Sequence, residues 1–231
     1  GHTERGIAFE VFMKGICGAL DKAQTELGIS SRLIMCFLRH LDEESAFETL
    51  ESSKPWLDRI TGVGLDSSEM GRPPRLFQKV FAAAGVLGLK RVAHAGEEGP
   101  PKYVYEALDL LKVDRIDHGN RSLEDPALIQ RLADSQMPLT VCPQSNLRLA
   151  VINKMSDHPI RRMLELGLKA CINSDDPAYF GGYMNENFHA LIDHTGLTRD
   201  EIFQLTINGF ESSFMTQSEK QVHLDRIRAM R

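Results

Sequence analysis

Residues 74–98 of the chain read PRLFQKVFAAAGVLGLKRVAHAGEE, and this stretch decides the fold. Its first part, Pro74 to Leu87, has the pattern of a helix. A short turn leads to a predicted strand, Arg91 to Ala95. This strand passes directly into the ionisable loop HAGEE. The stretch therefore predicts a helix, a strand and a polar loop where that strand ends.

The same unit of helix and strand recurs along the chain. Apolar residues spaced near 3.6 predict a first helix from Ile7 to Leu27 that stops at Gly28. The other predicted helices are Glu43–Ser52, Val104–Leu111, Pro126–Asp134, Pro159–Leu166, Asn187–His194 and Arg199–Phe214. The predicted strands, six in all, are Leu33–Leu38, Ile60–Leu65, Arg91–Ala95, Arg115–His118, Pro138–Cys142 and Lys169–Asn173. Such alternation through short loops indicates right-handed βαβ units and a parallel sheet.

Two arrangements of this sheet are compatible with the pattern. One is a doubly wound open sheet, and the other is a (β/α)8 barrel that lacks some of its units. No G-x-G-x-x-G or G-x-x-x-x-G-K-[ST] sequence follows any predicted strand, which weighs against a nucleotide-binding open sheet. No low-complexity linker interrupts the chain. Residues 1–231 are therefore expected to form a single α/β domain.

Composition limits the classes of function. The 231 residues are 42% hydrophobic and 26% charged, and the net charge of −5 is spread along the chain, so no basic face is available for a nucleic-acid partner. The longest uncharged apolar stretch, Val80 to Leu89, is far shorter than the roughly 20 residues that span a membrane. We therefore expect a cytoplasmic protein with a small-molecule or protein partner. The cysteines, which form no CxxC pair, are expected to be reduced core thiols: Cys17, Cys36, Cys142 and Cys171.

Polar and ionisable side chains gather where the predicted strands end. They form the groups Asp66-Ser67-Ser68-Glu69, His94-Ala95-Gly96-Glu97-Glu98, Asp117-His118-Gly119, Cys142-Pro143-Gln144-Ser145-Asn146 and Asn173-Ser174-Asp175-Asp176-Pro177. In parallel α/β proteins, and above all in barrels, the carboxyl ends of the strands build the active site. We therefore expect these groups to converge on one mouth.

Two histidines and a carboxylate stand out among these groups. Because side chains alternate along a strand, the spacing aims His94, His118 and Asp175 toward one space. Such a cluster suits zinc, with iron and manganese as alternatives. Each residue alone has a plainer interpretation, since a histidine at a strand end is more often structural, and the Asp175-Asp176 doublet before Pro177 is ordinarily a turn and helix cap. Their joint placement at strand ends favours the metal site.

The remaining histidines are weaker candidates for a metal or catalytic site. His40 follows the first predicted strand and could either face the mouth or cap the loop. The others lie on predicted helices or at helix edges and are expected at the surface: His158, His189, His194 and His223.

Four motifs together resemble the adenosine/adenine deaminase family: VAHAGEE at Val92–Glu98, RIDHG at Arg115–Gly119, LTVCPQSN at Leu139–Asn146 and NSDDPAYFGG at Asn173–Gly182. They occur in the order found in the family, and the resemblance covers essentially all of the chain. It implies a (β/α)8 barrel of the metal-dependent hydrolase kind with one zinc ion per chain. His94 matches a zinc-binding histidine of the family, and Asp175 matches its zinc-binding aspartate.

One part of the family pattern is missing. The family also binds zinc through a His-x-His pair on its first strand, and no His-x-His occurs in these 231 residues. The strand at Leu33–Leu38 looks like the family's third, so the first two strands are expected to be absent from this sequence. The chain would then be roughly the C-terminal three quarters of a single catalytic barrel of eight units. An inactive, purine-binding barrel fragment is the alternative from another class of function.

The resemblance also implies roles for residues at the mouth. The reaction would be hydrolytic deamination, in which water replaces the amino group at C6 of a purine and ammonia leaves. Glu97 matches the residue that protonates ring N1, a role that requires a raised pKa. His118 matches the residue that orients the attacking hydroxide, and Asp176 matches the residue that hydrogen-bonds N7.

The expected substrate is adenine, converted to hypoxanthine in purine salvage. The segments GLDSSEMGRPP at Gly64–Pro74 and HAGEEGPP at His94–Pro101 look like the adenine-specific branch of the family. In this interpretation Asp66, Ser68 and Glu69 bind the substrate, and the last two fill space that a ribose would need. Adenosine or a modified aminopurine nucleoside is the alternative, as is a related hydrolase that acts on pyrimidines or triazines. A homo-oligomer is compatible with the sequence.

Overall fold

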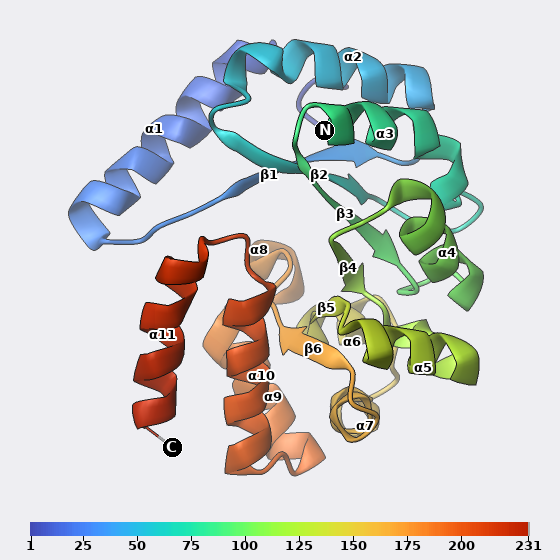
Figure 1. The fold of residues 1–231 in the computed structure, drawn as a ribbon, viewed down its shortest axis with the longest axis vertical. Helices are drawn as coiled ribbons and strands as arrows, with labels where there is room; N and C mark the ends of the chain where they lie inside the picture. The colour runs from blue at the N-terminus through green and yellow to red at the C-terminus, as the bar shows by residue number, and fades with distance from the viewer. Residues whose placement is uncertain (231) are drawn as a thin grey trace.

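Six parallel strands form the sheet of the computed structural model, which describes residues 1–230. The strands are β1 Leu33–Leu38, β2 Ile60–Asp66, β3 Lys90–Ala95, β4 Arg115–His118, β5 Pro138–Val141 and β6 Lys169–Ile172. Each strand pairs in parallel with the next one in the chain. Figure 1 shows this succession from β1 to β6. Because the strand order never reverses, the arrangement is that of a barrel and not of a doubly wound sheet.

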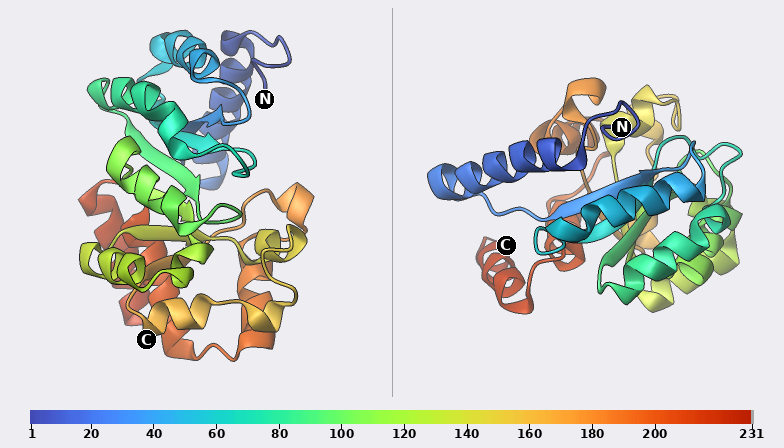
Figure 2. Two further views of the ribbon diagram at one scale, coloured as in Figure 1. Left: turned by 90° about the vertical axis from the view of Figure 1, so that its right-hand side faces the viewer. Right: turned by 90° about the horizontal axis from the view of Figure 1, so that it is seen from above.

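Helices precede, connect and follow the strands. They are α1 Phe9–Leu27, α2 Glu43–Ser53, α3 Gln78–Val86, α4 Pro101–Glu106, α5 Pro126–Ser135, α6 Pro143–Arg148, α7 Ile160–Glu165, α8 Pro177–Phe180, α9 Met184–Thr195, α10 Arg199–Ser212 and α11 Gln217–Ala229. Figures 1 and 2 show α2, α3, α4 and α5 following one another along one side of the strands. Within residues 1–230, no helix is both long and apolar enough to cross a membrane.

The strands begin and end within one residue of their predicted bounds, whereas the helices differ more. The predicted helix at residues 74–87 divides into a 3-10 turn, Pro74–Phe77, and α3, and the one at residues 104–111 divides between α4 and a π-helical turn, Ala107–Leu111. Helices α6, α8 and α11 were not predicted. The first two are too short to show a period, and α11 buries only Leu224 and Ile227, so its sequence lacks an apolar stripe.

The core lies between the sheet and its outer helices. Val63, Ile116 and Leu139 from the strands are fully buried, as are Phe81 of α3 and Leu128 of α5. Burying a side chain of this size contributes roughly 1.5–3 kcal/mol. Because each strand is anchored in this way from outside, the carboxyl ends of the strands are held in fixed relative positions.

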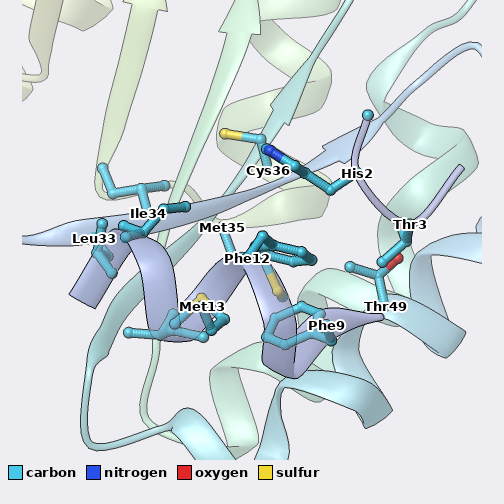
Figure 3. Close-up of a pocket in the computed structure, with 13 residues that line it drawn as sticks. His2, Thr3, Phe9, Phe12, Met13, Leu33, Ile34, Met35, Cys36 and Thr49 are labelled. Carbon is cyan, nitrogen blue, oxygen red and sulfur yellow. The ribbon is translucent and has the colours of Figure 1, made fainter. Parts of the chain in front are cut away.

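The sheet has two edge strands, β1 and β6, and an apolar hollow lies beside each. The hollow next to β1 has a volume of about 230 Å³, and Figure 3 shows Phe9, Phe12 and Met13 of α1 facing the side chains of β1 around it. The hollow next to β6 has a volume of about 270 Å³ and is also lined by α9 and α10. Neither is lined by the HAGEE loop or by β4, so the chemistry predicted from the sequence lies elsewhere.

Candidate active site

The side chains at the strand ends meet in one mouth, as the sequence predicts. The rings of His94 and His118 lie edge to face, with their centroids 4.7 Å apart. Nδ1 of His118 is 3.2 Å from Oε1 of Glu97, and its Nε2 is 3.9 Å from Oδ2 of Asp175. The second of these distances is too long for a hydrogen bond. Residues from β3, β4 and the loop after β6 therefore surround a common space.

His118 reaches the mouth through its backbone conformation and not through strand alternation. In the register of β3 and β4, His94 lies opposite Asp117, and Ala95 lies opposite His118. Alternation alone would aim His118 away from His94, so the reasoning that predicted its direction is wrong. The φ of His118 is +67°, in the left-handed region, and this turns the ring into the mouth. Asp175, which lies beyond the end of β6, is likewise left-handed, with a φ of +55°.

Asp117 is a site residue that the sequence interpretation missed. Its carboxylate accepts a hydrogen bond from the Thr140 hydroxyl at 2.7 Å, and it lies 3.6 Å from Nδ1 of His94 and 3.5 Å from Nε of Arg115. Burial raises the pKa of Asp117, but His94, Arg115 and Thr140 outweigh burial and hold the pKa below its ordinary value. A charged carboxylate therefore faces His94. The sequence did contain a signal for this residue: pairing the AHA segment of β3 with the IDH segment of β4 in parallel places Asp117 opposite His94.

Glu97 is suited to hold a proton near neutral pH. It is only 7% exposed, and burial is the main reason that its pKa rises to about 7. The charges of Glu69 and Asp175 add to this rise, and His94 opposes it. Burial and the charge of His94 lower the pKa of His118 to about 3, so this imidazole is neutral. A carboxylic acid and a neutral imidazole therefore lie side by side.

Glu69, which the sequence analysis assigns to substrate binding, supports the HAGEE loop through backbone hydrogen bonds. It is 1% exposed. Its carboxylate accepts backbone hydrogen bonds from Gly96 at 3.1 Å, Glu97 at 3.1 Å and Gly99 at 2.7 Å. Both carboxylate oxygens are thus occupied beneath the HAGEE loop. A carboxylate just after a strand looks like a mouth residue in sequence, because the backbone groups that surround it cannot be read there.

The other predicted substrate contacts lie at the rim of the mouth. Ser68 is exposed, and its hydroxyl donates to Glu98 at 2.9 Å. Asp66 is half-buried, burial raises its pKa, and its Oδ1 has no hydrogen-bond partner in residues 1–230. Asp176 is exposed and precedes α8, yet its side chain makes no capping hydrogen bond. The cap interpretation of the Asp175-Asp176 doublet is therefore not supported.

His40 belongs to the loops and not to the mouth. Its Nδ1 lies 2.9 Å from the Ser67 hydroxyl, and its Nε2 lies 3.1 Å from the Glu4 carboxylate. These contacts join the N-terminal segment to the loop after β2. Of the two interpretations left open by the sequence, the structure supports the one in which His40 holds a loop.

Of the histidines predicted at the surface, His158 is buried and His223 is partly buried. His158 is 5% exposed, with its Nε2 3.4 Å from Oδ1 of Asn146, and burial lowers its pKa to about 4. His223 is half-buried and stacks on Phe210, with the ring centroids 4.6 Å apart. The remaining predicted surface histidines are exposed: His189 and His194.

The donor groups at the mouth fit a divalent metal ion. Donor atoms of His118, Cys142 and Asp175 all lie within 4.8 Å of one another. Nδ1 of His94 and Nδ1 of His118 are buried and make no hydrogen bond to any described residue. Imidazole, carboxylate and thiolate are the groups that bind zinc in proteins. Cys142 was expected to be only a core thiol, and burial raises its pKa well above the ordinary value.

Parallel strands in chain order, with histidines and carboxylates gathered at their carboxyl ends, define a barrel of the metal-dependent hydrolase class. The family model described as Adenosine deaminase matches residues 1–230, and the chain belongs to this family. The resemblance and the fold class expected from the four motifs are thereby confirmed.

Proteins similar to this chain include several adenine deaminases. It is 61% identical over 229 residues to one from Sphingopyxis alaskensis and 59% identical over 228 residues to one from Caulobacter vibrioides, matches that cover 99% of this chain and 67% and 66% of those proteins. The structure of an Arthrobacter aurescens adenine deaminase matches with a TM-score of 0.97 at 46% identity, over 99% of this chain and 70% of that one. A Burkholderia ambifaria amidohydrolase with bound Zn matches with a TM-score of 0.86 at 30% identity, over 94% and 63%. The chain thus spans about two thirds of the length of its curated relatives.

Proposed function

We propose that the protein containing this chain hydrolyses adenine to hypoxanthine and ammonia. The observation that carries the proposal is the pair of Glu97 and His118, a buried carboxyl group with a pKa of about 7 whose Oε1 lies 3.2 Å from a neutral imidazole. Attack of water on an electron-poor ring needs a proton donor of this kind. The relatives named adenine deaminase, 61% and 59% identical, support adenine as the substrate.

The proposal includes one zinc ion per chain. His94 and Asp175 would bind it, and the family's His-x-His pair, which this sequence does not contain, would complete the set of ligands. When bound, such an ion acidifies water to a pKa of about 7 and so makes a nucleophile available at neutral pH. The amidohydrolase with bound Zn, 30% identical and of the same fold, supports this choice of metal.

The chain's own side chains would carry out the remaining steps. Protonated Glu97 would donate to ring N1 as the nucleophile adds at C6. Neutral His118 would orient the attacking group through a hydrogen bond. Asp176 would hydrogen-bond N7, and Asp66 would contact the base from the end of β2. The C6 amino group would then leave as ammonia, which gives the 6-oxo purine.

Preference for the base over the nucleoside would depend on the loop after β2. The carboxylate of Glu69 lies under the HAGEE loop, so Glu69 would act on this preference through the loop that it supports. Ser68 is exposed at the rim and stays the candidate for filling the space of a ribose. We further place the enzyme in the cytoplasm and in purine salvage, with a small-molecule substrate and no nucleic-acid or membrane partner.

The test compares adenine with adenosine on the full-length protein. Ammonia release and the ultraviolet change on formation of the 6-oxo purine report both reactions, and kcat/KM for adenine should exceed that for adenosine at least tenfold, which corresponds to about 1.4 kcal/mol. A preference for adenosine would favour the nucleoside alternative, which the name of the matching family suggests. Purine binding without turnover would favour the non-enzymatic alternative.

A further inference from the structure

A chain of buried polar side chains lies behind Glu97. Asn146 of α6 is fully buried, and its Nδ2 is 3.5 Å from Oε1 of Glu97. Oδ1 of Asn146 accepts a hydrogen bond from Nδ2 of Asn120 at 2.7 Å and lies 3.4 Å from Nε2 of His158. Polar groups are buried at a cost unless they are hydrogen-bonded, so these contacts determine how each side chain is oriented.

His158 has only one tautomer that satisfies its neighbours. Its Nδ1 accepts a hydrogen bond from the backbone N–H of Ile160 at 3.2 Å, so Nδ1 carries no proton. Burial keeps the ring neutral by lowering its pKa to about 4. The single proton of the ring therefore lies on Nε2, which points at Oδ1 of Asn146.

The orientation of the Asn146 amide follows from these two donors. Nδ2–H of Asn120 and Nε2–H of His158 both point at its oxygen, so the amide NH2 group must face Glu97. The distance of 3.5 Å to Glu97 is long for a hydrogen bond, and catalytic hydrogen bonds often shorten when substrate binds. Nδ1 of His118 lies 3.2 Å from the same oxygen of Glu97. Two nitrogen atoms, Nδ2 of Asn146 and Nδ1 of His118, therefore lie near Oε1.

We propose that Asn146, oriented by His158 and Asn120, is a positioning residue that keeps Oε1 of Glu97 as a hydrogen-bond acceptor and so leaves the acidic proton on Oε2. The inference rests on the proposed function, since it assigns the oxygen from which Glu97 protonates the purine. A carboxylic acid that is free to rotate would present either oxygen to the ring. Fixing the proton on one oxygen holds the donor in the direction of N1, which is an effect of orientation.

The side chain of Asn146 is separable from the structural contacts of its backbone. The carbonyl oxygen of Asn146 accepts hydrogen bonds from the backbone N–H groups of Val151 at 2.9 Å and Ile152 at 3.2 Å. These bonds hold the loop after α6 and do not involve the amide group. Substitution of the side chain therefore leaves the anchoring of this loop in place.

The experiment uses two variants of the full-length enzyme. Asn146→Asp keeps the shape of the side chain and its acceptor oxygens for His158 and Asn120 but removes the N–H that faces Glu97; Asn146→Ala removes both. Each should lower kcat for adenine by roughly tenfold to a hundredfold, a part of the 10² to 10⁴ that a positioned acid supplies. KM and the metal content should stay near those of the wild type. His189→Ala, at an exposed position of α9, is the control and should leave kcat unchanged.

Repeating the Asn146→Ala substitution in the Glu97→Gln variant distinguishes a positioning role of Asn146 from a merely structural one. In Glu97→Gln the group that Asn146 positions no longer carries a transferable proton, so adding Asn146→Ala should cost no further activity. The same fold loss in both backgrounds, or a wild-type kcat in Asn146→Asp, would overturn the inference while adenine deamination by the wild type leaves the proposed function standing. A wild type that does not deaminate adenine, although it carries its metal, would overturn both.

Discussion

At the scale of single residues, the site depends on backbone conformations that non-glycine residues rarely adopt. Ser67, His118 and Asp175 lie at or after the ends of three different strands and have positive φ values of 77°, 67° and 55°. Such conformations cost about 1–3 kcal/mol each and cluster at functional sites. The sequence identified His118 and Asp175 as site residues by their type and place. It could not give the direction of His118, because strand alternation no longer holds at a left-handed residue.

Replacing Glu97 by glutamine should abolish most turnover and keep the metal. An amide cannot transfer a proton to the ring, so kcat should fall by roughly 10² to 10⁴. Because the active form of Glu97 is the protonated one and its pKa is about 7, wild-type kcat should fall as pH rises above about 7. This alkaline decline should be absent from the residual activity of Glu97→Gln. Glu98→Gln is the matched control, because the Glu98 carboxylate accepts a hydrogen bond from the Ser68 hydroxyl at the rim. Equal losses of kcat in both variants would contradict the assignment of Glu97 as the proton donor.

At the scale of elements, the carboxyl end of β3 is held from below by two buried charged side chains. Arg39, which is fully buried, donates to the carbonyl oxygen of His94 at 2.8 Å and to that of Arg72. Glu69 accepts from three N–H groups of the loop that follows β3. Together they fix both sides of the segment that carries His94 and Glu97. Neither role could be predicted from sequence, since it depends on backbone groups that only the fold brings together.

Removing the carboxylate of Glu69 should destabilise the protein and change its substrate preference less than Ser68→Gly does. Glu69→Ala leaves three N–H groups under the HAGEE loop without an acceptor, and one such group costs roughly 1–3 kcal/mol. The urea midpoint at constant m-value measures this loss. Ser68→Ala, at the exposed neighbouring position, should change stability by about 0.5 kcal/mol or less. A stable Glu69→Ala variant, or one in which the ratio of adenine to adenosine activity changes more than in Ser68→Gly, would show that Glu69 contacts the substrate.

At the scale of the whole molecule, the sequence predicted the strands of the sheet better than the helices around them. Short segments between predicted helices identified all six strands, because most of these strands bury apolar side chains and this shows in their composition. It also predicted the convergence of polar groups at the mouth, since parallel strands end at the same side. It missed α11, which has almost no apolar stripe, and the placement of Cys142 near His118 and Asp175, since a buried thiol reads as an ordinary core residue.

Metal binding should stabilise the molecule as a whole, because the proposed ligand His94 lies in β3 and Asp175 lies after β6, and these two strands flank β4 and β5. An ion held by both ties β3 to β6 in the folded state only. At a free zinc concentration 100 times the Kd, this linkage is worth about 2.7 kcal/mol. A change of 1 kcal/mol moves Tm by about 2–4 °C in chains of 150–250 residues. Treating the full-length protein with a chelator should therefore lower its Tm by several degrees.

The variants decide which side chains hold that ion. His94→Ala and Asp175→Ala should contain less than one zinc per chain by elemental analysis, and the chelator should hardly change their Tm. Cys142→Ser is the matched control at the same mouth, and it should keep both the zinc and the response to the chelator, because the proposal assigns the ion to other side chains. Loss of zinc in Cys142→Ser would make the thiol a ligand. Full zinc content in both His94→Ala and Asp175→Ala would show that the ion is bound somewhere other than at the ends of β3 and β6.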